Sequence, residues 1–586
     1  MCGITAIFAY RDSAPAVDRD EVEAITQRMF PRGPDAGGTW FSTDGRVGLG
    51  SRRLAIIDLS PDGNQPMLDS SGQLAIVFNG EIYNYRELRA RLQRKGVRFR
   101  TTSDTEVLLE LYRSDGDRMV ELLRGMFAFA IWDLRTRRMF VARDAYGIKP
   151  FYVADDGHTI RMASTVKALQ AGGRISRAHD PGGVAGFWIL GSVPEPHTVF
   201  RDIRSVEAGT SFFIDASGVH PPRRYYSIAA TFARAAEEES AARLVEARIL
   251  MRECVTESLE HHLIADVAVG AFLSSGIDSS ALVSLATELR GVAPNTITLQ
   301  FAEFRGRQTD ESPLASRFAA ELGSDHATRL VSREEFIAEV PLLLDAMDQP
   351  TINGTNTYFV SKAARERGLK VALSGLGGDE LFGSYPSFRA LPRIVAASHF
   401  PLAAAALGRI VRNPKGEALA RYGRTYPGAY LLKRALFLPD DLPDIMGPQA
   451  AEEGLQKLSL LEHIAAAMSP DPRTTFGRIA TLEASLYMRN QLLRDTDWAS
   501  MAHSVEVRTP LVDAALLGHI APLLLVERRR CKQHFAESPR RPLPDYLKHR
   551  SKTGFAVPLA EWMQLPADGT SMRMRSWARR VWEHWA

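Results

Sequence analysis

A change of hydrophobic pattern near residue 240 constrains the fold of this 586-residue chain more than any other feature. Before it, short apolar segments bounded by turn residues predict mainly strands. These strands are expected at Cys2 to Tyr10, Val47 to Asp58, Leu74 to Asn79, Met126 to Asp133 and Met139 to Asp144. Helices are expected only at Tyr85 to Lys95 and Thr105 to Ser114. The pattern predicts a first domain dominated by β-structure.

After residue 240, helical periodicity alternates with apolar strands. The strands are expected at Ala268 to Leu273, Thr296 to Phe301 and Lys370 to Ser374, and the helices at Ala241 to His262, Ser280 to Leu289, Pro313 to Leu322, Glu334 to Met347 and Asn356 to Arg367. Repeated βα units predict a parallel, doubly wound sheet with helices on both faces.

A chain of this length usually forms more than one domain. Residues 216–239, with a Pro-Pro pair and an acidic end, are expected to link the two.

Composition excludes several classes of protein. With 45% hydrophobic and 24% charged residues, the chain is expected to fold rather than to remain disordered. A net charge of +3 with scattered arginines gives no reason to expect a nucleic-acid partner. Three cysteines are too few for a disulfide framework and match no zinc spacing. No apolar run is long enough to cross a bilayer and no leader is evident, so we expect a cytoplasmic protein without a membrane partner.

Cys2 is the first candidate catalytic residue. A methionine before a small residue is normally removed, which would leave a thiol beside a free α-amine that can serve as its base. A cysteine at this position would by itself more often be an ordinary strand residue. The motifs that accompany it are Met1-Cys2-Gly3-Ile4, Arg32-Gly33-Pro34-Asp35, Asn79-Gly80-Glu81-Ile82-Tyr83-Asn84 and Ser103-Asp104-Thr105-Glu106.

Together these motifs resemble a class II glutamine amidotransferase joined to a synthetase domain, as in the glutamine-hydrolysing asparagine synthetase family. The resemblance implies an α+β N-terminal-nucleophile domain, an αββα sandwich, over residues 2–215. It implies an α/β ATP-pyrophosphatase domain with a doubly wound parallel sheet over residues 240–586. By the same resemblance, Cys2 attacks glutamine, and Asn79 with the amide of Gly80 forms the oxyanion hole. The implied glutamine-binding residues are Arg53, Ile57, Asn79, Glu81 and Asp104.

A second site is indicated by two loops that follow strand ends. Ser274 to Ser280 opens a helix, a position where backbone N–H groups bind phosphate. Ser374 to Gly383 follows another strand, where open α/β sheets place ligands. The resemblance implies that ATP is bound by Leu273, Ser274, Gly276, Asp278, Ser279, Leu299, Ser374, Gly375 and Asp379. Asp278 and Asp379 would hold Mg²⁺, which prefers carboxylate and phosphate oxygens. Lys532 is the implied catalytic lysine of this site, because its distance from Leu543-Pro544 matches the family spacing.

Leu376 departs from the family pattern, which has a glutamate there that is associated with forming the aspartyl adenylate. A leucine cannot act as acid, base or ammonium ligand. The resemblance implies a carbon–nitrogen ligase that takes ammonia from glutamine and adenylates a carboxylate, with L-aspartate as the first expected acceptor. A different carboxylate, such as a cell-wall, polysaccharide or secondary-metabolite precursor, is the alternative that Leu376 favours.

Two further alternatives remain. An intramolecular amide-forming cyclase would not need the Cys2 thiol, and a non-catalytic scaffold would not need the polar sites. The intact set of Cys2, Asn79 and Asp104 argues against both. A homodimer is compatible with the sequence, which fixes neither the oligomeric state nor the ammonia route. Residues 390–475 match no motif.

Overall fold

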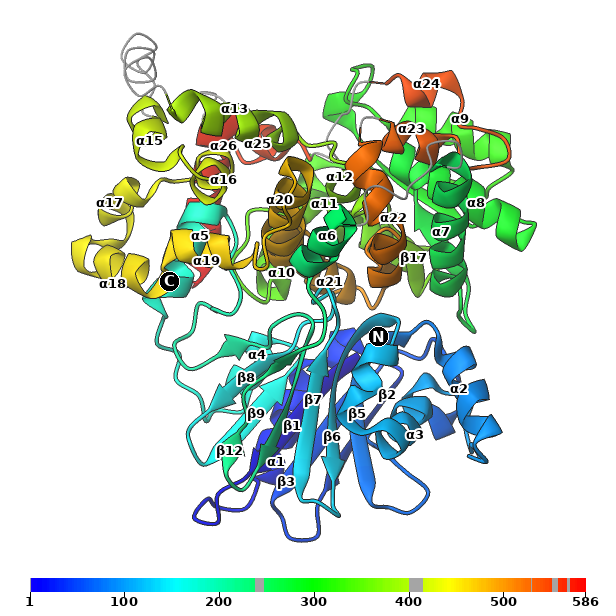
Figure 1. The fold of residues 1–586 in the computed structure, drawn as a ribbon, viewed down its shortest axis with the longest axis vertical. Coiled ribbons are helices and arrows are strands. Elements are labelled where there is room, and N and C mark those ends of the chain that lie inside the picture. The colour runs from blue at the N-terminus through cyan, green and yellow to red at the C-terminus, as the bar shows by residue number, and fades with distance from the viewer. Residues whose placement is uncertain are drawn as a thin grey trace.

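The computed structural model describes residues 2–237, 247–399, 415–528, 530–550, 557–565 and 570–585. Figure 1 shows a β-rich N-terminal part, coloured blue to cyan, packed against a larger part rich in helices. The predicted domain boundary at residue 240 and part of the expected linker lie outside the described residues. None of the described helices is long and apolar enough to span a bilayer.

Two antiparallel sheets form the N-terminal part. The first has the order β10-β8-β9-β1-β3-β2, and the second has the order β12-β11-β7-β6-β5-β4 with β13 paired to β11. Their strands are β1 (Cys2–Ala9), β2 (Ala36–Phe41), β3 (Val47–Arg53), β4 (Met67–Leu68), β5 (Leu74–Ile82), β6 (Gly125–Asp133), β7 (Arg138–Arg143), β8 (Tyr152–Asp155), β9 (Thr159–Ala163), β10 (Arg204–Ser205), β11 (Thr210–Asp215), β12 (Gly218–Val219) and β13 (Arg223–Arg224).

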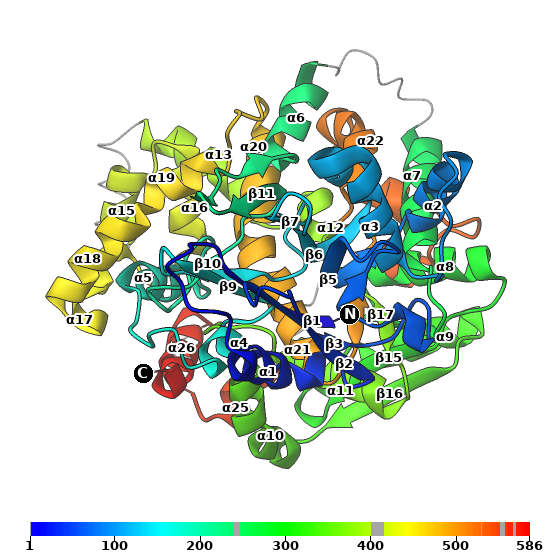
Figure 2. The same cartoon turned by 90° about the horizontal axis from the view of Figure 1, so that it is seen from below.

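Buried apolar side chains alternate between the two faces of each strand, and this gives the N-terminal part its sandwich architecture. In β1, Ile4, Ala6 and Phe8 enter the core between the sheets, whereas Ile7 packs with the residues of α1 on the outer face. Successive side chains of a strand point to opposite faces, so each sheet needs a helical cover. The covering helices are α1 (Arg19–Arg28) and α4 (Val166–Ala171) on one side and α2 (Tyr85–Arg94) and α3 (Asp104–Asp115) on the other. The predicted αββα architecture is confirmed, as Figure 2 also shows from below.

A five-stranded parallel sheet organises the second part, in the order β16-β15-β14-β17-β18. Its strands are β14 (Val269–Phe272), β15 (Thr296–Phe301), β16 (His326–Val331), β17 (Val371–Leu373) and β18 (Glu506–Arg508). The chain runs from β14 outward to β16 and then returns to β17 on the other side of β14. Such a reversal opens a crevice at the carboxyl ends of the two central strands, which is where open α/β sheets bind ligands.

The helices around this sheet come from distant parts of the sequence. They are α5 (Pro181–Leu190), α6 (Ile228–Glu237), α7 (Ala247–His262), α8 (Ile277–Arg290), α9 (Ser312–Leu322), α10 (Arg333–Ala346), α11 (Thr355–Glu366), α12 (Gly378–Leu381), α13 (Ser387–Ser398), α15 (Lys415–Tyr422), α16 (Tyr426–Arg434), α17 (Pro443–Met446), α18 (Pro448–Leu458), α19 (Leu460–Ala466), α20 (Thr475–Leu482), the π-helix Glu483–Leu493, α21 (Arg494–Met501), α22 (Ala514–Val526), α23 (Cys531–Ala536), α24 (Asp545–Lys548), α25 (Leu559–Trp562) and α26 (Thr570–Trp585). Most of α13 and all of α15 to α19 lie in the described part of residues 390–475, for which the sequence offered no motif.

The described part of the expected linker is structured, which the sequence did not indicate. It contains β13 and α6, and the side chains of Ile228, Thr231 and Phe232 are buried. The Phe232 ring meets Phe476 of α20 edge-on, with 6.2 Å between the ring centroids. Residues up to 237 therefore belong to the packed body of the protein.

We predict that Phe232→Ala lowers the stability of the protein by about 3 to 5 kcal/mol, because it removes a buried aromatic ring and leaves a cavity. Val219→Ala, at a side chain that is 43% exposed in the same stretch, should have almost no effect. Thermal and denaturant midpoints of the two variants measure the difference. Equal midpoints would mean that α6 does not stabilise the body of the protein.

Candidate active sites

Cys2 begins strand β1 and lies opposite Arg53 of β3. Its backbone nitrogen donates a hydrogen bond to Oδ1 of Asn79 at 3.0 Å. Burial raises the pKa of the Cys2 thiol. A buried thiol with a raised pKa needs a base to become a nucleophile, and the nitrogen of the same residue is the nearest group of suitable chemistry once Met1 is removed.

Asn79 offers an unused donor beside this nitrogen. Its Nδ2 is buried and has no hydrogen-bond partner among the described residues, an arrangement that costs free energy unless a ligand supplies the acceptor. The next residue, Gly80, has φ +152°, and a Cβ there would lie 2.0 Å from the carbonyl oxygen of Met126. Only glycine therefore lets β5 run close to β6 at this point. These features suit an oxyanion hole, the role predicted for both residues.

Two buried carboxyl groups lie close to Cys2. Burial raises the pKa of Asp104 to about 6, although the backbone N–H of Ile82 donates to its carboxylate. Burial and the neighbouring carboxylate of Glu506 raise the pKa of Glu81 well above its usual value. Oε2 of Glu81 has no hydrogen-bond partner in the described structure. A ligand cation, such as the ammonium of an amino acid, would relieve both effects.

Arg53 is buried by the loop that follows β3. Its guanidinium donates to the carbonyl oxygen of Ser60 at 3.0 Å, to Oδ1 of Asn64 at 2.9 Å and to the carbonyl oxygen of Ile57 at 3.1 Å. It also donates to the carbonyl oxygen of Asp58. The guanidinium and the Ile57 carbonyl oxygen are thus in contact, and a glutamine-binding role for Arg53 and Ile57 stays a prediction.

Two ion pairs that the sequence did not indicate join this site to the second part of the chain. Arg32 donates to the carbonyl oxygen of Cys2 and pairs with Asp497 of α21 at 2.6 Å. Nη2 of Arg508, at the end of β18, lies 3.4 Å from Oε2 of Glu81. All four of these charged side chains are buried. The partners are 465 and 427 residues apart in number, so no local pattern could reveal them.

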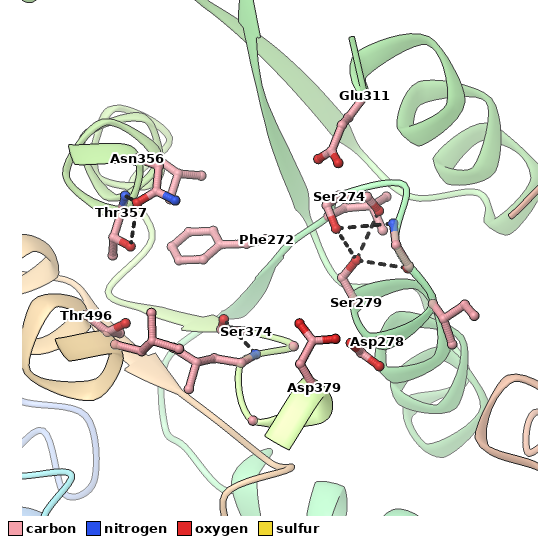
Figure 3. Close-up of a pocket in the computed structure, with 18 of the residues that line it drawn as sticks. Phe272, Ser274, Asp278, Ser279, Glu311, Asn356, Thr357, Ser374, Asp379 and Thr496 are labelled. Atoms are coloured by element: carbon pink, nitrogen blue, oxygen red, sulfur yellow. Dashed lines mark hydrogen bonds between the residues drawn. The ribbon is translucent and has the colours of Figure 1, made fainter. Parts of the chain in front are cut away.

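A cavity of about 590 Å³ lies at the carboxyl ends of β14 and β17 (Figure 3). The loop 274–279 forms one wall: Oγ of Ser274 and Oγ of Ser279 are 3.0 Å apart, and the N–H of Gly276 donates to Ser274 at 3.2 Å. The loop after β17 forms the facing wall. A Cβ at Gly375 would lie 2.8 Å from the backbone nitrogen of Ser279, so glycine is required for the two loops to approach.

Lys532, at the start of α23, reaches into this cavity between two carboxylates. Its Nζ lies 2.6 Å from Oδ2 of Asp278 and 3.3 Å from Oδ1 of Asp379. The carboxylates are neighbours in Figure 3. Burial opposes the lysine charge, but these two carboxylates raise its pKa overall. Two carboxylates facing a phosphate-binding loop fit Mg²⁺, which takes its remaining ligands from phosphate and water.

Besides Leu376, the lining of the cavity includes aromatic, amide, hydroxyl and acidic side chains. Among these are Asn353, Asn356, Thr357, Glu380, Tyr385, Tyr487, Asp495 and Thr496. Burial raises the pKa of Glu380 and of Asp495 to about 7. Asp495 accepts hydrogen bonds from Thr351 and from Trp498, both at 2.9 Å. No carboxylate occupies position 376, where a partly buried leucine packs on the core.

The structure brings together nearly all of the predicted residues. Leu273, Ser274, Gly276, Asp278, Ser279, Ser374, Gly375, Leu376, Asp379 and Lys532 line the cavity. Leu299 does not: it is buried in β15, and Ile297 and Thr298 line the wall instead. Arg550 is a lining residue that the sequence did not indicate. It donates to Oγ of Ser275 and lies 3.4 Å from Glu311.

The matches to known proteins cover both parts of the chain. A family model described as glutamine amidotransferase domain matches residues 1–226, and one described as asparagine synthase matches residues 250–580. The chain belongs to the asparagine synthase family. These matches confirm the predicted enzyme class, a ligase that combines glutamine amidotransfer with the use of ATP.

Relatives with different names share this organisation. The chain is 32% identical to asparagine synthetase (glutamine-hydrolyzing) 1 of Bacillus subtilis, and the match covers 99% of this chain and 90% of the relative. It is also 32% identical to amidase chry2 of Gibberella zeae, with 67% of this chain and 60% of that protein covered. The residue roles and the boundaries at 215 and 240 stay predictions.

The raised pKa of Asp104 predicts a pH-dependent affinity for glutamine. A carboxyl group with a pKa of about 6 is neutral below that pH, and a neutral acid does not attract an ammonium group. The KM for glutamine should therefore be constant well above pH 6 and rise by up to about tenfold per pH unit below it. Asp104→Asn should show a high KM throughout, and the exposed Asp12→Asn should behave as wild type. A wild-type KM that does not change between pH 5 and 8 would contradict this role.

Proposed function

We propose that the Cys2 site hydrolyses glutamine to ammonia and that the cavity at the sheet edge activates a carboxylate with ATP, which the ammonia then converts into an amide. The observation that carries this proposal is the position of α21. Its Asp495 lines the cavity, while its Asp497 pairs with Arg32, which in turn binds the Cys2 carbonyl. One helix thus connects the donor chemistry to the acceptor chemistry.

In the first reaction, the Cys2 sulfur attacks the side-chain carbonyl carbon of glutamine while the α-amine takes the thiol proton. The oxyanion that forms accepts hydrogen bonds from Nδ2 of Asn79 and from the N–H of Gly80. Donors placed where charge develops are worth about 10²–10³ in rate. Collapse of the intermediate releases ammonia and leaves a glutamyl thioester, which water hydrolyses. Arg53 holds the substrate carboxylate, and Glu81 and Asp104 hold its ammonium.

In the second reaction, a carboxylate oxygen attacks the α-phosphorus of ATP and pyrophosphate leaves. Ammonia then adds to the acyl carbon and displaces AMP. The loop amides and Lys532 stabilise the charge on the leaving pyrophosphate and on the tetrahedral intermediate. Asp278 and Asp379 would hold Mg²⁺, which neutralises phosphate charge. The buried ion pair between Arg32 and Asp497 joins the two sites, as suits ammonia that one site produces and the other consumes.

L-Aspartate is the reference acceptor, because the relatives that cover most of this chain are named asparagine synthetases. The alternative, a different carboxylate, is favoured by Leu376. We further propose that the enzyme works in the cytoplasm. A homodimer is possible, and size-exclusion chromatography with light scattering would test for it.

Cys2→Ala should abolish amide formation from glutamine and leave amide formation from ammonium salts intact, because only the donor reaction needs the thiol. Cys254→Ala, at a buried cysteine of α7, is the matched control and should keep both activities. Loss of both activities in a folded Cys2→Ala variant would argue against separate donor and acceptor sites.

Lys532→Ala should reduce carboxylate-dependent pyrophosphate release by about 10²–10³ while glutamine hydrolysis persists. The variant also leaves Asp278 and Asp379 facing each other without their cation, so its thermal midpoint is recorded alongside. Lys548→Ala changes a nearby lysine that pairs with Asp545 at the surface and should have no effect. Unchanged pyrophosphate release in Lys532→Ala would exclude this lysine from the reaction.

A further inference from the structure

A second cavity of about 550 Å³ adjoins the first. Asn353 and Tyr487 line both cavities and therefore form the partition between them. A volume of this size ordinarily holds a complete small molecule. The first cavity already offers room for a nucleotide, so the second provides space that a small acceptor such as L-aspartate would not use.

The partition is held in one arrangement. The guanidinium of Arg434 lies 3.6 Å from the centre of the Tyr487 ring, and Tyr385 meets the same ring edge-on at 5.9 Å. Arg434 is in turn fixed by Glu483, with Nε 3.0 Å from its carboxylate. On the other side, the N–H of Ile352 donates to the carbonyl oxygen of Gly191 at 3.0 Å, which ties the loop carrying Asn353 to the end of α5. These contacts hold both residues of the partition in place.

The charge of the second cavity differs from that of the first. Its described lining contains apolar side chains, amides and two cations, and no acidic residue: Leu190, Ser192, Ile352, Asn353, Tyr430, Lys433, Arg434, Ala435, Leu436, Leu486, Tyr487, Asn490, Gln491 and Met574. Arg434 is neutralised by Glu483. Lys433 is exposed and makes no ion pair within the described residues. The cavity therefore has one cation available to a ligand, at the end of α16.

From these features we propose that the acceptor is an extended carboxylic acid with an anionic group at its far end. Its reacting carboxylate lies in the first cavity beside Leu376, its body passes Asn353 and Tyr487, and its far anion pairs with Lys433. This inference rests on the proposed function and specifies its acceptor. The Leu376 side chain offers an apolar contact that suits a methylene next to the reacting carboxylate, and it offers no counter-charge of its own to an ammonium group.

Pyrophosphate release with purified full-length enzyme, ATP and Mg²⁺ tests the proposal. The probes are heptanedioate, nonanedioate, their monomethyl esters and L-aspartate. The half-esters keep the length and one carboxylate but remove the far charge. We expect kcat/KM for nonanedioate to exceed that for its half-ester and that for L-aspartate by about threefold to fivefold, because water screens an ion pair with an exposed lysine.

Lys433→Glu reverses the charge and should reduce the ratio of kcat/KM for nonanedioate to that for its half-ester by at least about threefold. Lys95→Glu changes an exposed lysine of the N-terminal part and should leave the ratio unaltered. Ser192→Phe, which fills the second cavity, should reduce turnover of the long probes more than that of L-aspartate. Thermal midpoints and glutamine hydrolysis show that each variant is folded.

The outcomes separate this inference from the function on which it rests. Pyrophosphate release with L-aspartate alone, or a nonanedioate preference that survives Lys433→Glu, overturns the extended acceptor but leaves the amidotransferase intact. An absence of pyrophosphate release with every probe, in enzyme that still hydrolyses glutamine, overturns both the proposed acceptor reaction and the extension.

Discussion

The buried ion pair between Arg32 and Asp497 is the interaction on which the arrangement of the two sites depends. Removing two charges from water costs several kcal/mol each, and breaking such a pair by deleting one partner usually costs about 3 to 5 kcal/mol. A pair of this kind therefore specifies one docking of the sandwich on the helical part more than it adds net stability. Because Arg32 also holds the Cys2 carbonyl, that docking and the position of the nucleophile are set together.

Arg508 forms a second buried ion pair between the two parts of the chain. It pairs with Glu81, and its own carbonyl oxygen accepts from the N–H of Ser374, the first residue of the loop after β17. The side chain and the backbone of a single residue thus contact Glu81 of the proposed glutamine site and Ser374 of the proposed nucleotide site. The short strand β18 is important for this reason, although only three residues form it.

The two cavities differ in the charge of their linings. The first is lined by several carboxylates and receives Lys532 and Arg550, as suits a magnesium-bound triphosphate. The second is apolar and amide-rich, with Lys433 as its available cation. The proposed acceptor thus depends on Leu376 and on the junction residues Asn353 and Tyr487, and not on the donor site or the phosphate loops. The region 390–475 then has a role, since α16 supplies one wall of the second cavity.

The sequence by itself determined the fold class and most of the two sites, because strands, loops and motifs such as Ser374 to Asp379 are encoded by residues close together in the chain. It did not reveal β16, β18 or α6, whose short or weakly patterned segments become ordered only by packing. The tertiary structure alone decided which charges meet across the interface, that Leu299 lies away from the cavity, and that Lys433 faces a second one. These facts depend on contacts between residues far apart in sequence, and a buried charge is tolerated only where folding brings its partner.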